Sequence, residues 1–341
     1  MKSRAQTNSR KLTRSGTDLI RAIELRDFKL AQTLLEAGAS PNAADEHGTP
    51  ALNRALYGTS KAKEGDEGIA TLLLEVGAEP DKPDSTGTTP IMLATKNGFE
   101  RVVNLLLKKG VNVNARPKRG VLTYAGSALC IAAAGGHRKL VWALIAAGAD
   151  VNQPSSRGLN ALSAASSSGD INIVRDIIQA GGRATGLDLF EPVKSGRLDI
   201  VHELLDAGAD VNVTDRWANS LLGVAVQADH ADVARTIIAA GAKLDAHSGG
   251  RTPLIIAVCN ENKSLVDILL HAGAKVDARD IYGCTALMEA AIRPQKDILL
   301  RLLHAGCNPR LKSEKGDSAI SLAKERKMLD NIKLLEQAAQ S

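Results

Sequence analysis

Residues 250–257 read GRTPLIIA, and residues 269–275 read LLHAGAK. The first phrase suits the start of a helix, because Thr252 can accept hydrogen bonds from free backbone N–H groups and Pro253 loses no needed donor. The second phrase ends an apolar helical stretch at Gly273, and glycine tolerates the left-handed backbone that follows many helices. Together the two phrases predict a pair of helices that begins after Thr252 and ends before Gly273.

Both phrases recur along the chain. The start of the pair returns as GTTPIMLA at residues 87–94, with Thr89 and Pro90 in the same places. The end returns at Gly38, Gly77, Gly110, Gly148, Gly181, Gly208, Gly241, Gly273 and Gly306. These recurrent glycines are separated by 39, 33, 38, 33, 27, 33, 32 and 33 residues. Self-similarity with a period of about 20–50 residues indicates a repeat protein rather than a set of globular domains.

The two phrases resemble the signature of the ankyrin repeat, a glycine turn followed by TPLHxA, and 33 residues is the length of that repeat. The resemblance implies an all-α repeat solenoid built from helix–turn–helix units that are joined by β-hairpin loops. It places nine repeats from about Ser15 to Lys312, followed by a capping repeat from Glu314 to about Ala338. We therefore expect one domain over residues 15–338, a disordered basic tail at residues 1–14 and a short tail at residues 339–341.

Three repeats depart from the common length. The second has about six extra residues in the polar stretch 59–68, which we place between its two helices, and the fourth has five extra in its hairpin, residues 116–124. Such insertions are either recognition elements or surface loops without a role. The sixth repeat lacks six residues at 182–188, which should leave a gap in its row of hairpins.

The composition indicates how the repeats are packed. Only 2% of the residues are aromatic, although 44% are hydrophobic, so aliphatic side chains and alanine must build the core. Apolar pairs near the end of each second helix are the clearest candidates for its buried face: Leu105 with Leu106, Ile237 with Ile238 and Leu269 with Leu270.

Charge and motifs bear on the class of function. The formal net charge is +5, but five basic residues without any acid lie in the first 14 residues, so the remaining chain is balanced. The four cysteines form no CxxC pair, and no phosphate-binding loop, zinc-protease motif or serine-nucleophile motif occurs. No apolar run approaches the ~20 residues of a membrane helix. We expect a cytoplasmic protein with free thiols, no enzyme activity, no cofactor and no metal; nuclear location or delivery into a host cell stays open.

The asparagines that follow the recurrent glycines have two interpretations. Asn114, Asn152 and Asn212 resemble positions that asparaginyl hydroxylases modify in some animal ankyrin proteins. The alternative is structural, because asparagine suits a tight turn.

In ankyrin proteins the usual contact surface is the concave side, which consists of hairpin tips and the exposed faces of the first helices. Carrying this family pattern over by position gives candidate partner-binding residues at Glu46, His47, Tyr57, Lys96, Asn97, Lys118, Arg119, Tyr124, Arg157, Arg216, Trp217, Asn219, Gln227, Arg251, Tyr282 and Arg293.

Two features of this set suggest a kind of partner. Trp217 and Tyr282 occupy hairpin positions without a core role, so they either form an interface hot spot or, for Trp217, fold down over neighbouring leucines. The set is also rich in lysine and arginine and contains only one acid, Glu46. We expect a monomer that binds a protein, with an acidic peptide or protein surface as the natural complement, and acts as an adaptor, scaffold or inhibitor. The alternative is polyanion binding, to nucleic acid or anionic lipid, through the basic groove and the N-terminal tail.

Overall fold

The computed structural model describes residues 16–57, 64–117, 126–155 and 158–340. Its contacts divide the chain into two compact units that adjoin between Arg183 and Ala184, where the sequence predicted a single domain. In the first unit, residues 16–24 are helical, and the further helices are α2 (Phe28–Glu36), α3 (Ala51–Leu56), α4 (Glu64–Glu75), α5 (Pro90–Asn97), α6 (Glu100–Lys108), α7 (Ala128–Ala134), α8 (Arg138–Ala146), α9 (Ala161–Ser168) and α10 (Ile171–Gln179).

The second unit starts with a short 3₁₀ helix, η1 (Gly186–Leu189), and continues as further helix pairs. Its α-helices are α11 (Phe190–Lys194), α12 (Leu198–Asp206), α13 (Leu221–Gln227), α14 (Ala231–Ala239), α15 (Pro253–Cys259), α16 (Lys263–His271), α17 (Ala286–Ala291), α18 (Lys296–His304), α19 (Ala319–Glu325) and α20 (Leu329–Gln340). Because α20 continues through Gln340, Ala339 and Gln340 are helical rather than part of a tail.

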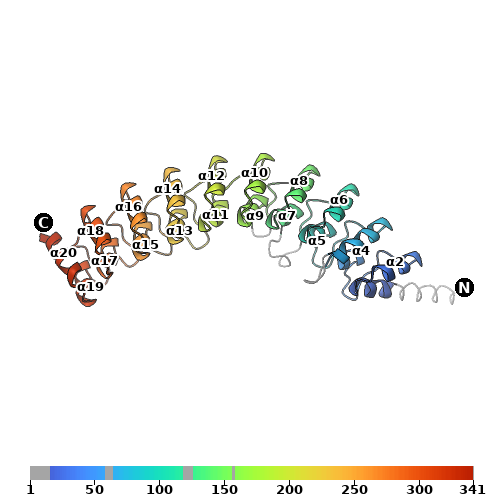
Figure 1. Ribbon diagram of the computed structural model, residues 1–341, viewed down its shortest axis with the longest axis horizontal. Coiled ribbons are helices and arrows are strands. Elements are labelled where there is room, and N and C mark those ends of the chain that lie inside the picture. The colour runs from blue at the N-terminus through green and yellow to red at the C-terminus, as the bar shows by residue number, and fades with distance from the viewer. Residues whose placement is uncertain (1–15, 58–63, 118–125, 156–157, 341) are drawn as a thin grey trace. The chain divides into compact units, whose positions relative to one another are not determined.

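Within each unit the helices form two rows (Figure 1). In the first unit α3, α5, α7 and α9 contact one another in succession, and so do α2, α4, α6, α8 and α10. In the second unit the row of first helices is α11, α13, α15, α17 and α19, and the row of second helices is α12, α14, α16, α18 and α20. The predicted fold class, an all-α repeat solenoid with hairpin loops, is confirmed.

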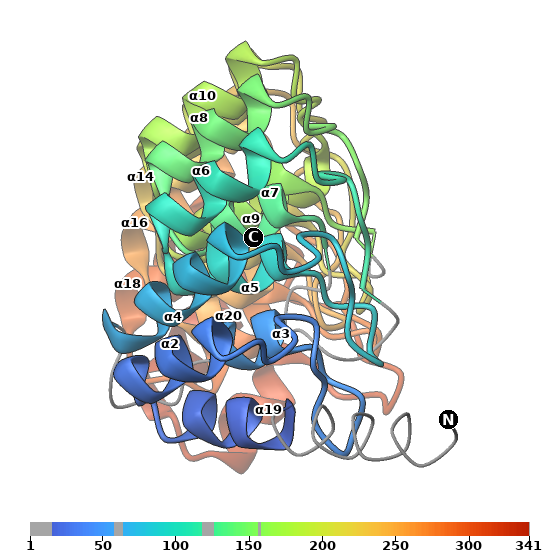
Figure 2. The ribbon, with the colours of Figure 1, turned by 90° about the vertical axis from the view of Figure 1, so that its right-hand side faces the viewer.

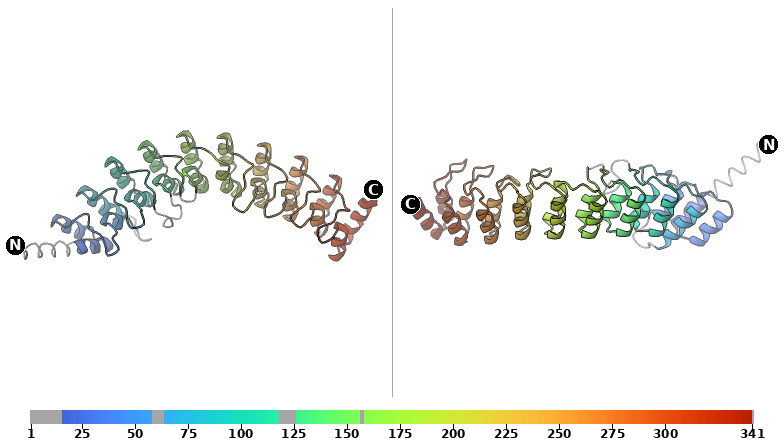
Figure 3. Two further views of the ribbon diagram at one scale, coloured as in Figure 1. Left: turned by 180° about the vertical axis from the view of Figure 1, so that it is seen from behind. Right: turned by 90° about the horizontal axis from the view of Figure 1, so that it is seen from above.

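Hairpin loops connect successive pairs and project on one side of the helices in each unit (Figures 2 and 3). Several of them are closed by isolated antiparallel bridges: Ala44 to Pro50, Thr214 to Ser220, Ser248 to Arg251, Arg279 to Thr285 and Lys312 to Ser318.

The two predicted threonine caps differ. Thr252 accepts a hydrogen bond from the N–H of Ile255 at 3.3 Å, as expected for an N-cap. The hydroxyl of Thr89 makes no such bond and is buried without a partner, so the predicted cap at Thr89 is wrong. Helix α5 still begins at Pro90, because the fixed φ of proline favours the first helical position.

Only one member of each predicted apolar pair is fully buried. Leu106, Ile237 and Leu269 are completely inaccessible, whereas the other member of each pair, Leu105, Ile238 or Leu270, is partly exposed. The buried member always lies four residues before the recurrent glycine. The prediction that both members share the buried face is therefore half right, because adjacent helical residues point about 100° apart.

Polar side chains join successive repeats at the loops that follow the second helices. The Oδ1 of Asn212 accepts a hydrogen bond from the N–H of Lys243 (2.8 Å), and its Nδ2 donates to the carbonyl of Gly241 (3.0 Å). Other residues four positions after a recurrent glycine accept from the next repeat's backbone in the same way: Asn42, Asp81, Asn114, Asn152, Asp245 and Asp277. We call this interaction the inter-repeat clamp.

The sixth repeat has threonine at the clamp position. Thr185 donates its N–H and its hydroxyl to the carboxylate of Asp188, within its own turn (2.7 and 2.8 Å). Here η1 leads directly into the five-residue helix α11, which contains Pro192. The boundary between the two compact units lies one residue before Thr185, at the repeat whose sequence is shortest.

The insertion in the second repeat is partly helical. Residues 64–68, predicted as loop, belong to α4, which has 12 residues where α6, α8 and α10 have 9. Residues 58–63, most of the enlarged fourth hairpin (118–125) and the basic tail lie outside the described residues.

Leu204 and Leu205 allow a matched test of the buried position. Leu204 is fully buried and Leu205 is partly exposed. We expect Leu204→Ala to lower the free energy of unfolding by about 2–5 kcal/mol, as large-to-small core changes do, and Leu205→Ala to lower it by about 1 kcal/mol, because less apolar area is lost. Chemical denaturation followed by circular dichroism measures both, and equal losses would contradict the assignment of the buried face.

Helix α11 should be locally less stable than its counterparts in the third and eighth repeats. It is short, Pro192 contributes no N–H group, and Thr185 does not clamp the following loop. Native-state hydrogen exchange should show faster exchange for the amides of Phe190–Lys194 than for those of α5 and α15. Protection as high as in α5 and α15 would show that the missing hairpin and clamp have no local effect.

Candidate interaction surface

An aspartate at the start of the turn shapes four of the hairpins. The Oδ1 of Asp215 accepts hydrogen bonds from the N–H groups of Trp217 and Asn219, both at 2.9 Å. The carboxylates of Asp45, Asp84 and Asp280 likewise accept from the N–H groups two and four residues later. Burial opposes ionisation of Asp45, Asp84 and Asp215, but these hydrogen bonds prevail and hold the pKa of each below its usual value. Each turn thereby holds two residues at its tip.

The tip residues of the second unit include large apolar side chains that face solvent. Trp217 is 66% exposed, and the guanidinium of Arg216 lies 3.9 Å from the centre of the indole ring, in a cation–π arrangement. Tyr282 is 62% exposed and Ile281 58%. Trp217 therefore does not fold down over neighbouring leucines.

Neighbouring tips in the second unit are hydrogen-bonded to one another. The N–H of Gly249 donates to the side chain of Asn219 (2.9 Å), and the N–H of Ile281 donates to the carbonyl of Gly250 (3.0 Å). The N–H of Glu314 then donates to the carbonyl of Tyr282 (3.1 Å). These bonds hold four successive hairpins in a fixed order. We call the row formed by Trp217, Gly249, Gly250, Ile281 and Tyr282 the aromatic edge.

The remaining candidates of the second unit differ in their exposure to solvent and in the bonds that their side chains already make. Gln227 and Arg251 are exposed, whereas Asn219 is held by the bond to Gly249. Arg293 forms an ion pair with Glu289 at 2.7 Å, and the two side chains are only 21% and 16% exposed. A partner would have to break this pair to use Arg293, so Arg251 is the more accessible arginine of the two.

The candidates in the first unit form a separate group. Glu46 and His47 are exposed at one hairpin tip. The Oε1 of Glu46 lies 3.6 Å from the Nε2 of His47. The hydroxyl of Tyr57 donates to Asp84, and burial together with this bond raises the pKa of Tyr57 to about 12. Tyr57 is thus tied to the next hairpin rather than free for a partner.

Two further candidates of the first unit lie on α5. Lys96 is exposed in the last turn of the helix. The side-chain amide of Asn97 donates to the carbonyl of Leu56 at 2.6 Å, which links α5 to the end of α3. Lys96 therefore stays accessible to a partner, whereas Asn97 has a structural partner of its own.

Only part of the predicted basic groove can be assessed. Lys118, Arg119, Tyr124, Arg157 and the tail lie outside the described residues. In the described part of the chain, Lys96, Arg216 and Arg251 are exposed, but Glu289 pairs with Arg293 and the turn aspartates add negative charge to the hairpins. The described surface therefore carries separate basic positions rather than a uniformly basic groove.

The turn aspartates and the inter-repeat clamp were missed in the sequence. Both have a simple signal: the turn aspartate lies three residues before a hairpin glycine at Asp45, Asp84 and Asp280, and the clamp residue lies four after a recurrent glycine. In Asn114, Asn152 and Asn212, both ends of the side-chain amide are bonded to the next repeat, which supports the structural interpretation of these asparagines.

The four cysteines are free thiols. Burial raises the pKa of Cys130, Cys259, Cys284 and Cys307, that of Cys307 to about 12, so these thiols are poor nucleophiles at neutral pH. Among the described residues no cluster of histidine, cysteine, aspartate and glutamate has the makings of a metal site. In the same part of the chain, no helix combines the length and the apolar character needed to span a membrane.

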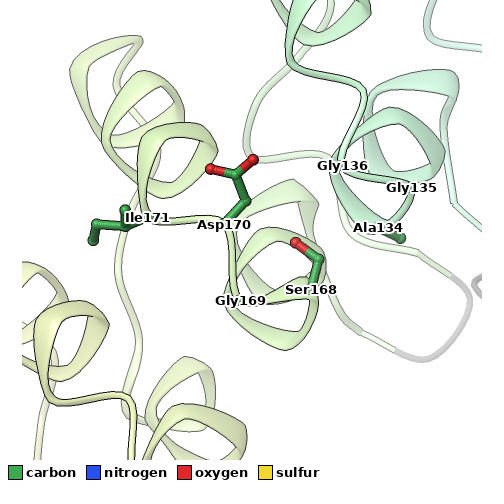
Figure 4. A pocket seen from close by; sticks show the side chains of 7 residues that line it. All are labelled: Ala134, Gly135, Gly136, Ser168, Gly169, Asp170 and Ile171. Atoms are coloured by element: carbon green, nitrogen blue, oxygen red, sulfur yellow. The ribbon is translucent and has the colours of Figure 1, made fainter.

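A pocket lies between the ends of α7 and α9 (Figure 4). It is lined by Ala134–Gly136 and Ser168–Ile171. The carboxylate of Asp170 caps α10 by accepting from the N–H groups of Asn172 and Ile173, and the hydroxyl of Ser168 donates to the carbonyl of Ala165. Its polar side chains are thus used to end one helix and begin the next.

Comparisons with known proteins agree with this architecture. A putative ankyrin repeat-containing protein of Treponema pallidum is 35% identical over 134 residues, which are 39% of this chain and 45% of that protein. Neurogenic locus notch homolog protein 1 of Xenopus tropicalis is 32% identical over 161 residues, 45% of this chain and 6% of that protein. The B-cell lymphoma 3 protein homolog of Mus musculus is 30% identical over 174 residues, 48% of this chain and 39% of that protein. The chain spans less than half the length of each of these relatives.

The family model for three ankyrin repeats matches residues 19–117, 59–154 and 189–280, and the model for one ankyrin repeat matches residues 282–314. These matches cover well over half of the chain and follow the same repeats as the helix pairs. The chain belongs to the ankyrin-repeat family.

Proposed function

We propose that this chain is a non-catalytic protein-binding module that holds its partner on the hairpin and first-helix face of the second unit. Ankyrin repeats generally mediate protein–protein interactions, and the chain has the repeats of that family. The observation that carries the proposal is the aromatic edge, where Trp217, Ile281 and Tyr282 expose large apolar side chains on the two hairpins that flank the Gly249-Gly250 hairpin. Exposed aromatic residues of this kind supply most of the binding energy at many interfaces.

The hydrogen bonds between hairpins make this edge suitable for binding. The tips of four hairpins are joined through Asn219, Gly250 and Tyr282, so a partner would meet side chains whose backbone is already ordered. A preformed surface loses less conformational entropy on association than a mobile one, which leaves more of the contact energy available for affinity.

The charged residues beside the aromatic edge indicate which kind of partner surface would fit it. Arg216 and Arg251 are exposed next to the aromatic edge, and arginine forms strong, charge-assisted hydrogen bonds with carboxylates. We propose a partner with acidic residues beside the apolar side chains that cover Trp217. Such a module would act by occupancy, as an adaptor, scaffold or inhibitor.

Truncating Trp217 should weaken binding selectively. A partner would be captured from lysate with the full chain, and its dissociation constant measured by calorimetry. We expect Trp217→Ala to lose on the order of 2 kcal/mol of binding free energy, because it removes a central aromatic contact. Trp142→Ala is the matched control, since Trp142 is 44% exposed but lies on α8 in the other unit. If both variants, checked for equal helicity, bind as tightly as the wild type, the interface lies elsewhere.

Removing the charge of Arg251 should change the salt dependence of binding. We expect Arg251→Gln to bind more weakly at low ionic strength and to lose less affinity as salt is added, because a screened attraction is gone. Arg235→Gln serves as the control, since Arg235 is also exposed but lies on the second helix α14. If affinity depends on salt concentration in the same way for both variants and the wild type, Arg251 is not part of the interface.

A further inference from the structure

The hairpin that precedes α15 is shorter than its neighbours. Its bridge joins Ser248 to Arg251, three residues apart, whereas the bridges from Thr214 to Ser220 and from Arg279 to Thr285 span six. Only Gly249 and Gly250 form its tip, with φ of 56° and 81°. Two central residues with positive φ are typical of the two-residue type I′ turn.

The tip of this hairpin is bare main chain in the middle of the aromatic edge. A Cβ atom at Gly249 would have no other atom within 4 Å, so the space around Gly249 is open. A Cβ atom at Gly250 would lie 2.7 Å from the Cδ1 of Ile281, which shows that Ile281 packs against this glycine. The adjacent hairpins present Trp217 on one side and Ile281 with Tyr282 on the other.

The bare tip is also fixed on both sides. Gly249 donates its N–H to Asn219 in the preceding hairpin, and Gly250 accepts from the N–H of Ile281 in the following one. Without a Cβ atom, the backbone at Gly249 can be approached more closely than at any tip that carries a side chain. Exposed arginines, Arg216 and Arg251, lie in the same stretch of surface.

We infer that an extended segment of the partner crosses the hairpin tips over Gly249, placing a large apolar side chain beside Trp217 and an Asp or Glu near Arg216 or Arg251. Residues two apart in an extended chain point to the same side, so one such segment can present an apolar and an acidic side chain together. This inference rests on the proposed function and specifies its partner as an acidic, extended peptide segment.

The test uses peptides as the probe. A random twelve-residue peptide library is selected on the full chain, and the enriched peptides are labelled with fluorescein for anisotropy titrations. We expect the enriched peptides to share a large apolar residue two positions from Asp or Glu. A library from which no such peptides are enriched would overturn the inference.

Substitutions at Gly249 then locate the path of the peptide. Asn-Gly is the preferred pair for a type I′ turn, so Gly249→Asn retains the hairpin while adding a side chain in the open space. We expect it to weaken peptide binding on the order of tenfold, and Gly249→Asp, of the same shape but negatively charged, to weaken it further at low salt. Gly48→Asn is the matched control, because Gly48 also has a positive φ (76°) and open surroundings, in a hairpin of the first unit.

The variants separate the inference from the proposed function. Peptides that lose affinity with Trp217→Ala but bind Gly249→Asn like the wild type would overturn the crossing over Gly249 and leave the aromatic edge as the binding surface. Peptides that bind Trp217→Ala and Gly249→Asn without loss would overturn both. Equal effects of Gly249→Asn and Gly249→Asp would overturn the acidic character of the segment.

Discussion

In each unit, the loops between most successive repeats are held in order by one polar side chain, and the sixth repeat, with Thr185 at this position, is an exception. The clamp residue lies four positions after the recurrent glycine and accepts a hydrogen bond from the loop of the next repeat. In Asn114, Asn152 and Asn212, the side-chain amide also donates to the carbonyl of the next recurrent glycine. Loop backbone that leaves helices needs such partners, because unpaired polar groups near a packed core are costly. The apolar helix faces supply the burial, and the clamp determines how the exposed loops are placed relative to one another.

Each hairpin continues from one of these loops, so the arrangement of the loops also sets the arrangement of the hairpins. Since each hairpin starts from a clamped loop, a second polar residue, the turn aspartate, is enough to define the tip. The tip residues themselves take no part in this framework, so their side chains can differ from repeat to repeat. Glu46 with His47, Arg216 with Trp217 and Ile281 with Tyr282 occupy equivalent positions and have quite different chemistry. The chemistry of the hairpin tips thus varies from repeat to repeat, whereas the polar framework that holds them recurs.

The periodic part of this structure could be predicted from the sequence, and the non-periodic part could not. The recurrent glycines give the helix pairs, the hairpins and the shortened sixth repeat because each feature repeats at a fixed distance from a residue with a defined backbone conformation. The pairing of Tyr57 with Asp84 joins residues 27 apart and depends on side-chain rotamers, which no pattern reveals. The pairing of Arg293 with Glu289 has the four-residue spacing of a helical ion pair and was within reach of sequence reasoning. The exposure of Trp217 and its cation–π contact with Arg216 are properties of the folded hairpin and could be seen only in the structure.

The inter-repeat clamp also has a direction. The side chain always belongs to the earlier repeat and the backbone it binds to the later one, as from Asn114 to Asp150 and from Asp245 to Lys275. A chain that leaves the ribosome N-terminus first therefore presents the side chain before its backbone partner has been synthesised. Each newly emerged repeat finds a ready acceptor on its predecessor and can be added to an already ordered stack. Within each unit this polarity matches the order of synthesis, so the acceptor side chain of each clamp exists before the backbone that it binds.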